Sequence, residues 1–302
     1  MKKIKSLFCI GLLLTVATTV NAQSVTWISS TEGNVWQKSK VKLQSKSEQN
    51  PVLQVDGTEN GVVFKNWGTT FNELCWDALG LLTRTEQDEI LYNIFSPQGD
   101  LRITRGRISM GANDYARSWY SCDEVEGDFE LRYFNINRDK QTIIPFIRAA
   151  QKYNPNLTFW ISPWCPPSWM KINGDYPVLS SPFNSLSEKQ NYLLYGATGG
   201  QVDENEMKLT DARDGVFPRQ LATTDFMIQD PRYLQTYADY FCRFIDAYKE
   251  QGIPIDMVMY QNEAYSYTPY PGCAWTAAGT IRFNKEYLAP TLKQMHPEVK
   301  LY

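Results

Sequence analysis

The 302-residue chain carries 30 Lys and Arg against 33 Asp and Glu, a formal net charge of −3, and it contains a single histidine. A surface that binds nucleic acid normally shows as a basic patch, so this balance argues against such a partner. One histidine leaves almost no material for a Ser-His-Asp or Cys-His mechanism, and no CxxC spacing indicates zinc. Carboxylates must therefore carry any chemistry, and we expect neither a metal nor a cofactor.

Residues 1–22 have the pattern of a bacterial secretory signal peptide. Three lysines precede an apolar stretch from Leu7 to Val16, and Val20-Asn21-Ala22 is a small-residue cleavage pattern. The alternative is a membrane anchor, but a helix that spans a bilayer needs roughly 20 apolar residues, which this stretch does not reach. We therefore expect an exported protein, secreted, periplasmic or held at the cell surface, without stable membrane insertion.

Residues 23–64 differ in pattern from the rest of the chain. Polar and apolar residues alternate along Val41–Gln44 and Val52–Val55, and turn signals such as Asn50-Pro51 separate them, which predicts antiparallel strands. From 65 to 302, apolar runs alternate with amphipathic helices, the pattern of a parallel α/β domain. We therefore expect a small β region followed by a barrel-like domain.

The elements of the second region repeat as strand and helix. Helices are predicted at 83–95, 139–153, 231–251 and 276–295, and strands near Phe64 and Ile103, at 157–162 and 256–261, and near Leu301. An insertion at about 174–230 is rich in Gly, Pro, Asn and Ser, and a loop of that length usually covers an active site or is mobile. Five strands fall three short of an eight-stranded barrel, whose open edges would be costly, so we expect a longer natural protein.

The tripeptide Gln261-Asn262-Glu263 follows the apolar run Met257–Tyr260, just beyond a predicted strand. Catalytic groups of barrel enzymes project from the carboxyl ends of strands. Tyrosines on both sides would desolvate Glu263 and raise its pKa, which keeps a proton available for a leaving oxygen near neutral pH. Asn262 would hydrogen-bond a sugar hydroxyl. The alternative, left open by the tripeptide alone, is an ordinary surface carboxylate at a strand end.

The segment Ser162–Lys171 also follows a strand, and its three prolines and two tryptophans make it stiff. Flat sugar faces stack on indole rings, so we expect Trp164 at the rim to contact a sugar, with Trp169 nearby. The alternative is that one ring, above all Trp169, packs beneath the loop as core.

The segment from Arg107 to Asp114 ends the preceding strand in the same way. An arginine inside a barrel needs an acidic partner, because an unpaired buried charge is expensive. Arg107 would orient a catalytic carboxylate, and Asp114 would accept hydrogen bonds from two sugar hydroxyls. A purely structural ion pair of Arg107 is the alternative.

Together these three motifs resemble the glucosylceramidase-like family, glycoside hydrolase family 30. In that family an SPW-x-x-P-x-W-M/L-K segment follows strand 3, an R-x-P-x-x-x-x-D pattern ends strand 2, and a Q/E-N-E-P motif ends strand 4. This chain has Ser109 and Ala264 in place of the two motif prolines, and it keeps one glycine, Gly68, of the usual cluster at the first strand end. The resemblance runs from about Trp67 to the end of the chain, apart from the insertion.

The resemblance implies a (β/α)8 TIM barrel with an attached β-domain, and a retaining β-glycosidase that forms a covalent glycosyl-enzyme. It implies Glu263 as the acid/base, Asn262 as its substrate-orienting neighbour, and Asp114 and Trp164 as contacts to the first sugar. The family's nucleophile is a glutamate at the end of strand 7, beyond these residues, so we expect the 302 residues alone not to turn over. The implied partner is a β-linked glycoside or glucan, including β-1,6-glucan; the alternative is a non-catalytic carbohydrate-binding protein.

Overall fold

The computed structural model describes residues 24–42, 64–186, 225–264 and 266–302. The signal-peptide prediction, the strand predicted at Val52–Val55 and most of the predicted insertion lie outside these ranges. The chain divides into two compact units, residues 1–63 and residues 64–302.

The first unit contains one described antiparallel pair, β1 (Ser24–Thr31) and β2 (Asn34–Lys42). The register places Val25 opposite Val41 and Trp27 opposite Ser39. Successive side chains of a strand point to opposite faces, so these four residues share one face of the pair. The predicted antiparallel strands are therefore confirmed for this stretch.

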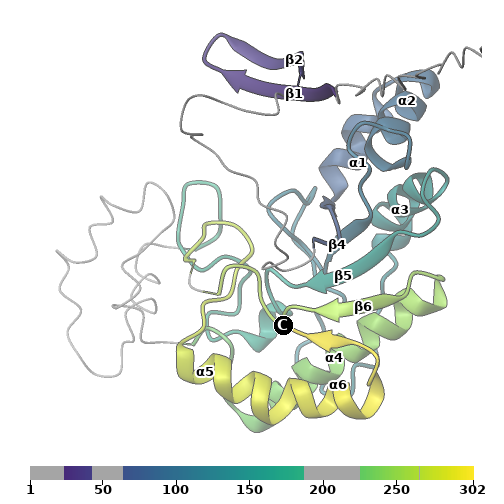
Figure 1. The fold of residues 1–302 in the computed structure, drawn as a ribbon. Helices are drawn as coiled ribbons and strands as arrows, with labels where there is room; N and C mark the ends of the chain where they lie inside the picture. Colours follow the sequence, from purple (N-terminus) through teal and green to yellow (C-terminus); the bar gives the residue numbers. More distant parts are fainter. Residues whose placement is uncertain (1–23, 43–63, 187–224, 265) are drawn as a thin grey trace, which may run out of the picture. The chain divides into compact units, whose positions relative to one another are not determined.

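The second unit is built on a five-stranded parallel sheet whose strands lie side by side in chain order (Figure 1). The strands are β3 (Gly68–Phe71), β4 (Arg105–Ser109), β5 (Thr158–Ser162), β6 (Ile255–Val258) and β7 (Lys300–Leu301). Parallel neighbours in sequence order are the connectivity of a (β/α)8 barrel, as predicted. One predicted strand position is corrected, because the first strand begins at Gly68 and not near Phe64, whereas the second, predicted near Ile103, begins two residues later at Arg105.

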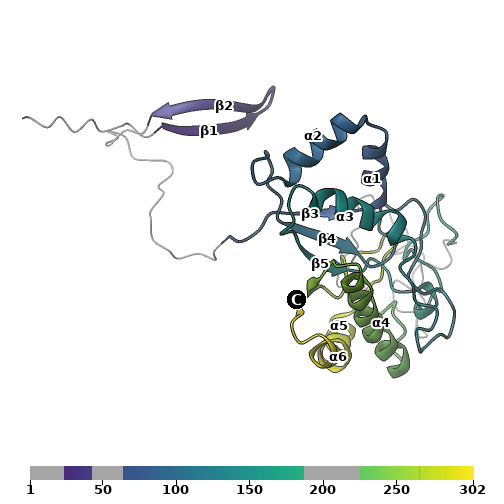
Figure 2. The same ribbon diagram turned by 90° about the vertical axis from the view of Figure 1, so that its right-hand side faces the viewer.

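Helices connect consecutive strands and cover the sheet (Figure 2). The helices are α1 (Glu73–Gly80), α2 (Arg84–Phe95), η1 (Asp139–Gln141), α3 (Ile143–Gln151), η2 (Ser168–Met170), α4 (Pro231–Glu250), α5 (Ala277–Arg282), η6 (Phe283–Leu288) and α6 (Ala289–Met295). Helix α1 was not predicted. Thr83 caps α2, because its side chain and that of Glu86 form a reciprocal capping box at the start of the helix.

The predicted helix 276–295 is continuous but changes its winding. Its middle part, η6, is a π-helix that ends two residues before Pro290. Proline lacks an N–H, and in a regular helix its ring collides with the carbonyl four residues earlier, here that of Glu286. The wider turns just before Pro290 fit that steric conflict, so the chain passes the proline without breaking the helix.

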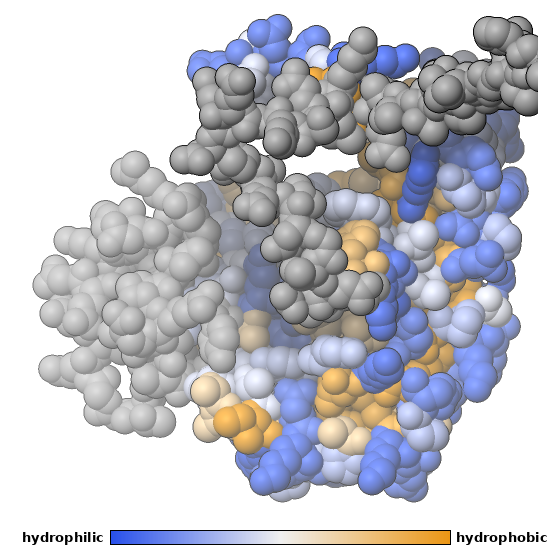
Figure 3. Space-filling view, in the orientation of Figure 1, coloured by the Kyte–Doolittle hydropathy of each residue, from blue (hydrophilic) through white to orange (hydrophobic). Residues whose placement is uncertain are grey.

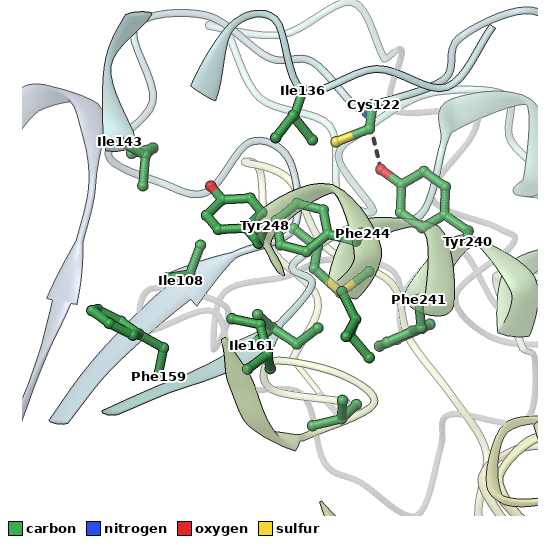
Figure 4. Packing of buried hydrophobic residues seen from close by; sticks show 14 of the residues in the cluster. Ile108, Cys122, Ile136, Ile143, Phe159, Ile161, Tyr240, Phe241, Phe244 and Tyr248 are labelled. Carbon is green, nitrogen blue, oxygen red and sulfur yellow. Dashed lines mark hydrogen bonds between the residues drawn. The ribbon is translucent and has the colours of Figure 1, made fainter. Parts of the chain in front are cut away.

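The hydrophobic core lies between the sheet and the helices. Figure 4 shows Phe244 and Tyr248 of α4 on the side of Ile108 and Ile161 of the strands, and all four side chains are fully buried. Figure 3 shows further apolar side chains at the surface over the middle of this unit, where the sheet lies. The core therefore fixes the strands, and the strands fix the loops that leave their carboxyl ends.

Candidate active site

Three loops meet at the carboxyl end of the sheet, after β4, β5 and β6. Arg107 in β4 donates from Nη2 to the Ser162 Oγ at the end of β5 (2.8 Å) and to the Asn262 Oδ1 after β6 (2.7 Å). Carboxyl ends of parallel strands share one edge of the sheet, which explains why residues 55 and 155 positions apart in sequence meet here.

Arg107 is partly buried and lies among aromatic rings. Its guanidinium carbon lies 4.0 Å from the ring centroid of Trp164 and 4.9 Å from that of Trp160. Burial lowers the pKa of Arg107 to about 10, and the negative charges of Asp114 and Glu263 oppose this shift. Arg107 therefore stays cationic at neutral pH, with both predicted carboxylates within its electrostatic reach.

The structural ion pair that was the alternative for Arg107 is not among the salt bridges of the described ranges. Its side-chain hydrogen bonds in the described ranges go to the neutral side chains of Ser162 and Asn262. A guanidinium held by neutral acceptors keeps its charge uncancelled by close contact, so the site has a positive centre with Asp114 and Glu263 around it.

Trp164 is 6% exposed, and its carbonyl accepts a hydrogen bond from the Gln261 Nε2 at 2.6 Å. Because the Arg107 guanidinium covers one face of the indole, that face cannot stack on a sugar. What remains for a sugar contact is the small exposed part of the ring.

Trp169 lies in η2, and its contacts are with other elements. Its indole N–H donates to the Asp123 carbonyl (3.1 Å), and its ring packs against Phe129 and Tyr233 at centroid distances of 5.4 and 5.7 Å. These contacts match the alternative stated for this residue, a ring packed beneath the loop, and the structure does not bring Trp169 to Arg107 and Asn262.

Glu263 has an unusual backbone, with φ at +49°. The left-handed region costs a residue other than glycine about 1–2 kcal/mol. Neighbouring hydrogen bonds hold the chain there: Asn262 N–H donates to the Pro163 carbonyl, and Ser266 N–H donates to the Glu263 carbonyl, both at 2.8 Å. Glu263 is exposed, so the described residues do not desolvate its side chain as the sequence predicts. Tyr265, one of the tyrosines expected to desolvate it, lies outside the described residues.

Two site features were not singled out from the sequence. Burial and the charges of Glu263 and Asp114 raise the pKa of Tyr270, so both carboxylates act electrostatically on this tyrosine. The Gln261 side chain is a junction, because its Oε1 accepts from the Trp275 indole N–H (3.2 Å) while its Nε2 donates to the carbonyls of Trp164 and Asn262. Tyr270 stands in an aromatic, proline-rich segment, which is only a weak sequence signal for a site residue. No sequence signal indicates the hydrogen bond between Gln261 and Trp275.

A model of the glycosyl hydrolase family 30 TIM-barrel domain matches residues 64–181, a range that includes β3 to β5 and four of the predicted site residues, Arg107, Asp114, Trp164 and Trp169. Over these residues the chain matches glycoside hydrolase family 30. The match covers Arg107 in β4 and the loops after β4 and β5 that carry Asp114 and Trp164, so it supports the predicted fold where that fold builds the site.

Two curated relatives match most of this chain. One is a Caenorhabditis elegans protein with the provisional name glucosylceramidase 3. The chain is 29% identical to it over 268 residues, and this alignment covers 85% of the chain and 42% of that protein. The chain is 25% identical over 252 residues to an endo-1,6-β-D-glucanase of Aspergillus fumigatus, covering 82% of the chain and 45% of the relative. The chain thus spans less than half the length of these relatives.

Solved structures share the fold. SrfJ from Salmonella typhimurium aligns with a TM-score of 0.63 at 18% identity. The alignment covers 91% of this chain and 52% of the SrfJ chain. An endo-β1,6-glucanase aligns with a TM-score of 0.58 at 22% identity, over 80% and 44%.

The described ranges contain neither a candidate metal-binding group nor a candidate membrane-spanning helix. No group of three or more His, Cys, Asp or Glu residues in them is arranged to hold a metal ion. No helix in the same part of the chain combines the length and apolar character needed to cross a membrane.

Proposed function

We propose that the protein is a β-glycosidase that hydrolyses O-glycosidic bonds with net retention, with Glu263 as its acid/base. The observation that carries the proposal is the hydrogen bond of 2.7 Å from Arg107 to Asn262, because it joins two predicted site segments beside Glu263. The family match supports the reaction class.

Each side chain has a role in this proposal. Glu263 protonates the leaving oxygen in the first step and takes a proton from water in the second. Asn262 orients the sugar: its Oδ1 is held by Arg107, so its Nδ2 is the atom that donates to a hydroxyl oxygen. Asp114 accepts from two hydroxyls of the first sugar, and the exposed edge of Trp164 contacts the ring. We leave Trp169 out of the proposed sugar site because of its packing.

Retention requires a second carboxyl group about 5–5.5 Å from the first, acting as nucleophile. The family's nucleophile is a glutamate at the end of the seventh strand, and we propose no residue of this chain for that role. That the nucleophile lies outside these residues, and that the 302 residues alone are inactive, stay predictions. The intact mass of the natural protein, compared with 34.8 kDa for these residues, tests the first of them.

The proposed substrate is a β-linked glucoside or glucan, β-1,6-glucan included. One relative is named for glucosylceramide and another for 1,6-β-glucan. The predicted signal peptide supports an exported enzyme that meets its substrate outside the cytoplasm, and the excess of acidic residues agrees with an uncharged polymer as partner.

The test compares leaving groups in the natural protein and its Glu263→Gln variant. A poor leaving group needs protonation and an activated aryl group does not, so we expect kcat/KM to fall about 10²–10⁴-fold for the first and much less for the second. Equal losses on both would contradict the acid/base role. Binding of a β-glucan without any hydrolysis by the natural protein would favour the non-catalytic alternative.

A further inference from the structure

Trp275 lies directly behind the catalytic segment and is anchored in the core. It is 2% exposed, and its ring stacks on Phe283 of η6 at 5.3 Å and meets Tyr260 edge-on at 5.7 Å. Phe283 belongs to the helix that covers this side of the sheet, and Tyr260 comes two residues after β6. The indole therefore connects a fixed helix to the end of the strand that delivers Glu263.

Two hydrogen bonds from Trp275 bracket the catalytic pair. Its backbone N–H donates to the Ala264 carbonyl at 2.9 Å, and its indole N–H donates to the Gln261 Oε1 at 3.2 Å. Ala264 follows Glu263 in sequence, and Gln261 precedes Asn262. One buried residue thus holds the chain on both sides of Asn262 and Glu263.

The second bond also fixes the Gln261 amide. An indole N–H can only donate, so the amide oxygen must face Trp275 and the amide nitrogen must face away from it. That nitrogen donates to the Trp164 carbonyl at 2.6 Å and to the Asn262 carbonyl at 2.9 Å. Gln261 is 6% exposed, so water cannot readily replace these partners. Trp275 therefore acts on both loops of the proposed sugar site through Gln261.

This arrangement explains how a glutamate stays in a costly conformation. With φ at +49°, the Glu263 backbone is strained, and a return to an ordinary conformation would relieve that strain and redirect its side chain. We infer that Trp275 is a positioning residue for the acid/base: its two hydrogen bonds keep Glu263 left-handed and aimed at the glycosidic oxygen. The inference rests on the proposed function and adds to it a residue outside the matched motifs.

The test separates positioning from simple core packing with a matched control. Trp275→Phe keeps an aromatic ring and removes the indole N–H. Tyr240→Phe likewise removes one hydrogen bond of a fully buried aromatic, because the Tyr240 hydroxyl on α4 accepts from the Cys122 N–H at 2.9 Å, away from the site. Both variants lose stability, measured as thermal unfolding midpoints, but only the first alters Glu263.

We expect Trp275→Phe to lower kcat/KM about 10–100-fold for a substrate with a poor leaving group and less than about 3-fold for an activated one, since a misplaced acid costs of this order. Tyr240→Phe should change both by less than about 3-fold. In a crystal structure of Trp275→Phe, the Glu263 φ should turn negative. Equal losses on both substrates, or an unchanged φ with an unchanged ratio, would overturn the inference.

Two further variants keep the result interpretable. If Trp275→Phe does not fold, Gln261→Met removes the same contact from the other side and should show the same leaving-group preference; equal losses there would also overturn the inference. Glu263→Gln is measured in parallel. If it shows no leaving-group preference, the proposed function fails, whereas a normal Glu263→Gln result beside an unselective Trp275→Phe rejects the positioning role alone.

Discussion

Strand β4 carries two arginines, Arg105 and Arg107, two residues apart and so on the same face of the sheet. Arg105, at the amino end, forms a salt bridge with Asp256 in β6 and donates to the Thr158 hydroxyl. Arg107, at the carboxyl end, has hydrogen bonds to neutral Ser162 and Asn262, with carboxylates near but not paired. A closed ion pair serves stability, while an unpaired cation can act on groups that must do chemistry.

The largest effect should follow from Arg107→Met. It removes the donor that holds Asn262 and the positive charge near Asp114 and Glu263, so we expect kcat/KM to fall about 100-fold or more, as for a lost preorganised donor. The unfolding midpoint should change little, because burial of this cation is itself costly. Assays beside thermal melts check both. If Arg105→Met reduced activity as much, the contrast between the two ends of β4 would be wrong.

A buried carboxylate offers a second case of a charge with neutral partners. Asp139 is fully buried, burial raises its pKa to about 6, and hydrogen bonds from Tyr248 (2.6 Å) and Tyr120 (2.7 Å) oppose the shift. The ordinary pKa is 3.8, so the folded state binds the proton more tightly. Asp139 therefore costs no stability below about pH 4, and its cost grows as pH rises and is complete above pH 6.

Asp139→Asn removes that cost, because an amide does not ionise and can still accept from one tyrosine and donate to the other. Relative to the parent protein, we expect the free energy of unfolding of the variant to be higher by up to about 3 kcal/mol at pH 7.5 and to be unchanged at pH 4. Urea unfolding at the two pH values measures the difference. A gain that is independent of pH would show that the carboxyl is not the cause.

Gly106 lies between the two arginines, and its place is sterically closed. A Cβ there would stand 2.6 Å from a Phe71 ring atom and 2.8 Å from one of Phe159. Gly106→Ala should therefore cost about 1–3 kcal/mol of stability through overpacking. We expect activity to fall in step with the amount of folded protein, measured by circular dichroism. A larger loss of activity would contradict this expectation and show that Arg107 has moved.

The smallest effect should come from Arg105→Met. The Asp256 side chain is 47% exposed, and half-exposed pairs contribute about 1 kcal/mol or less. We expect a loss of that size at low salt that shrinks in 0.5 M NaCl, with kcat/KM unchanged. A loss independent of salt would mean that packing of the arginine stem, not its charge, is what matters.

The order of elements was predictable because local signals mark it. Thr83 with Glu86, and Asp230 with Pro231, set helix starts through side chains a few residues apart. Helix α1 was missed although Asn72 caps it locally. Its further support is distant, because Glu73 is 2% exposed and pairs with Arg138, 65 positions away.

The site was predictable only in part. Motifs at strand ends identified Arg107, Asn262 and Glu263 as neighbours, because parallel strands bring such ends together. The left-handed backbone of Glu263 and the bond between Gln261 and Trp275 depend on how loops fold back, which no spacing encodes. Trp164 and Trp169 look alike in sequence, and only packing separates them.

The hydrogen bond from the Arg107 guanidinium to the Asn262 Oδ1 has a consequence for which sugars the proposed site accepts. Such an amide can offer a ligand nothing but N–H, since a half-turn flip would set donor against donor at Arg107. A sugar whose hydroxyl is replaced by an ammonium would meet that same repulsion from the other side. In the proposed sugar site, the polarity of this single side chain therefore excludes a protonated amino group at the position that Asn262 contacts.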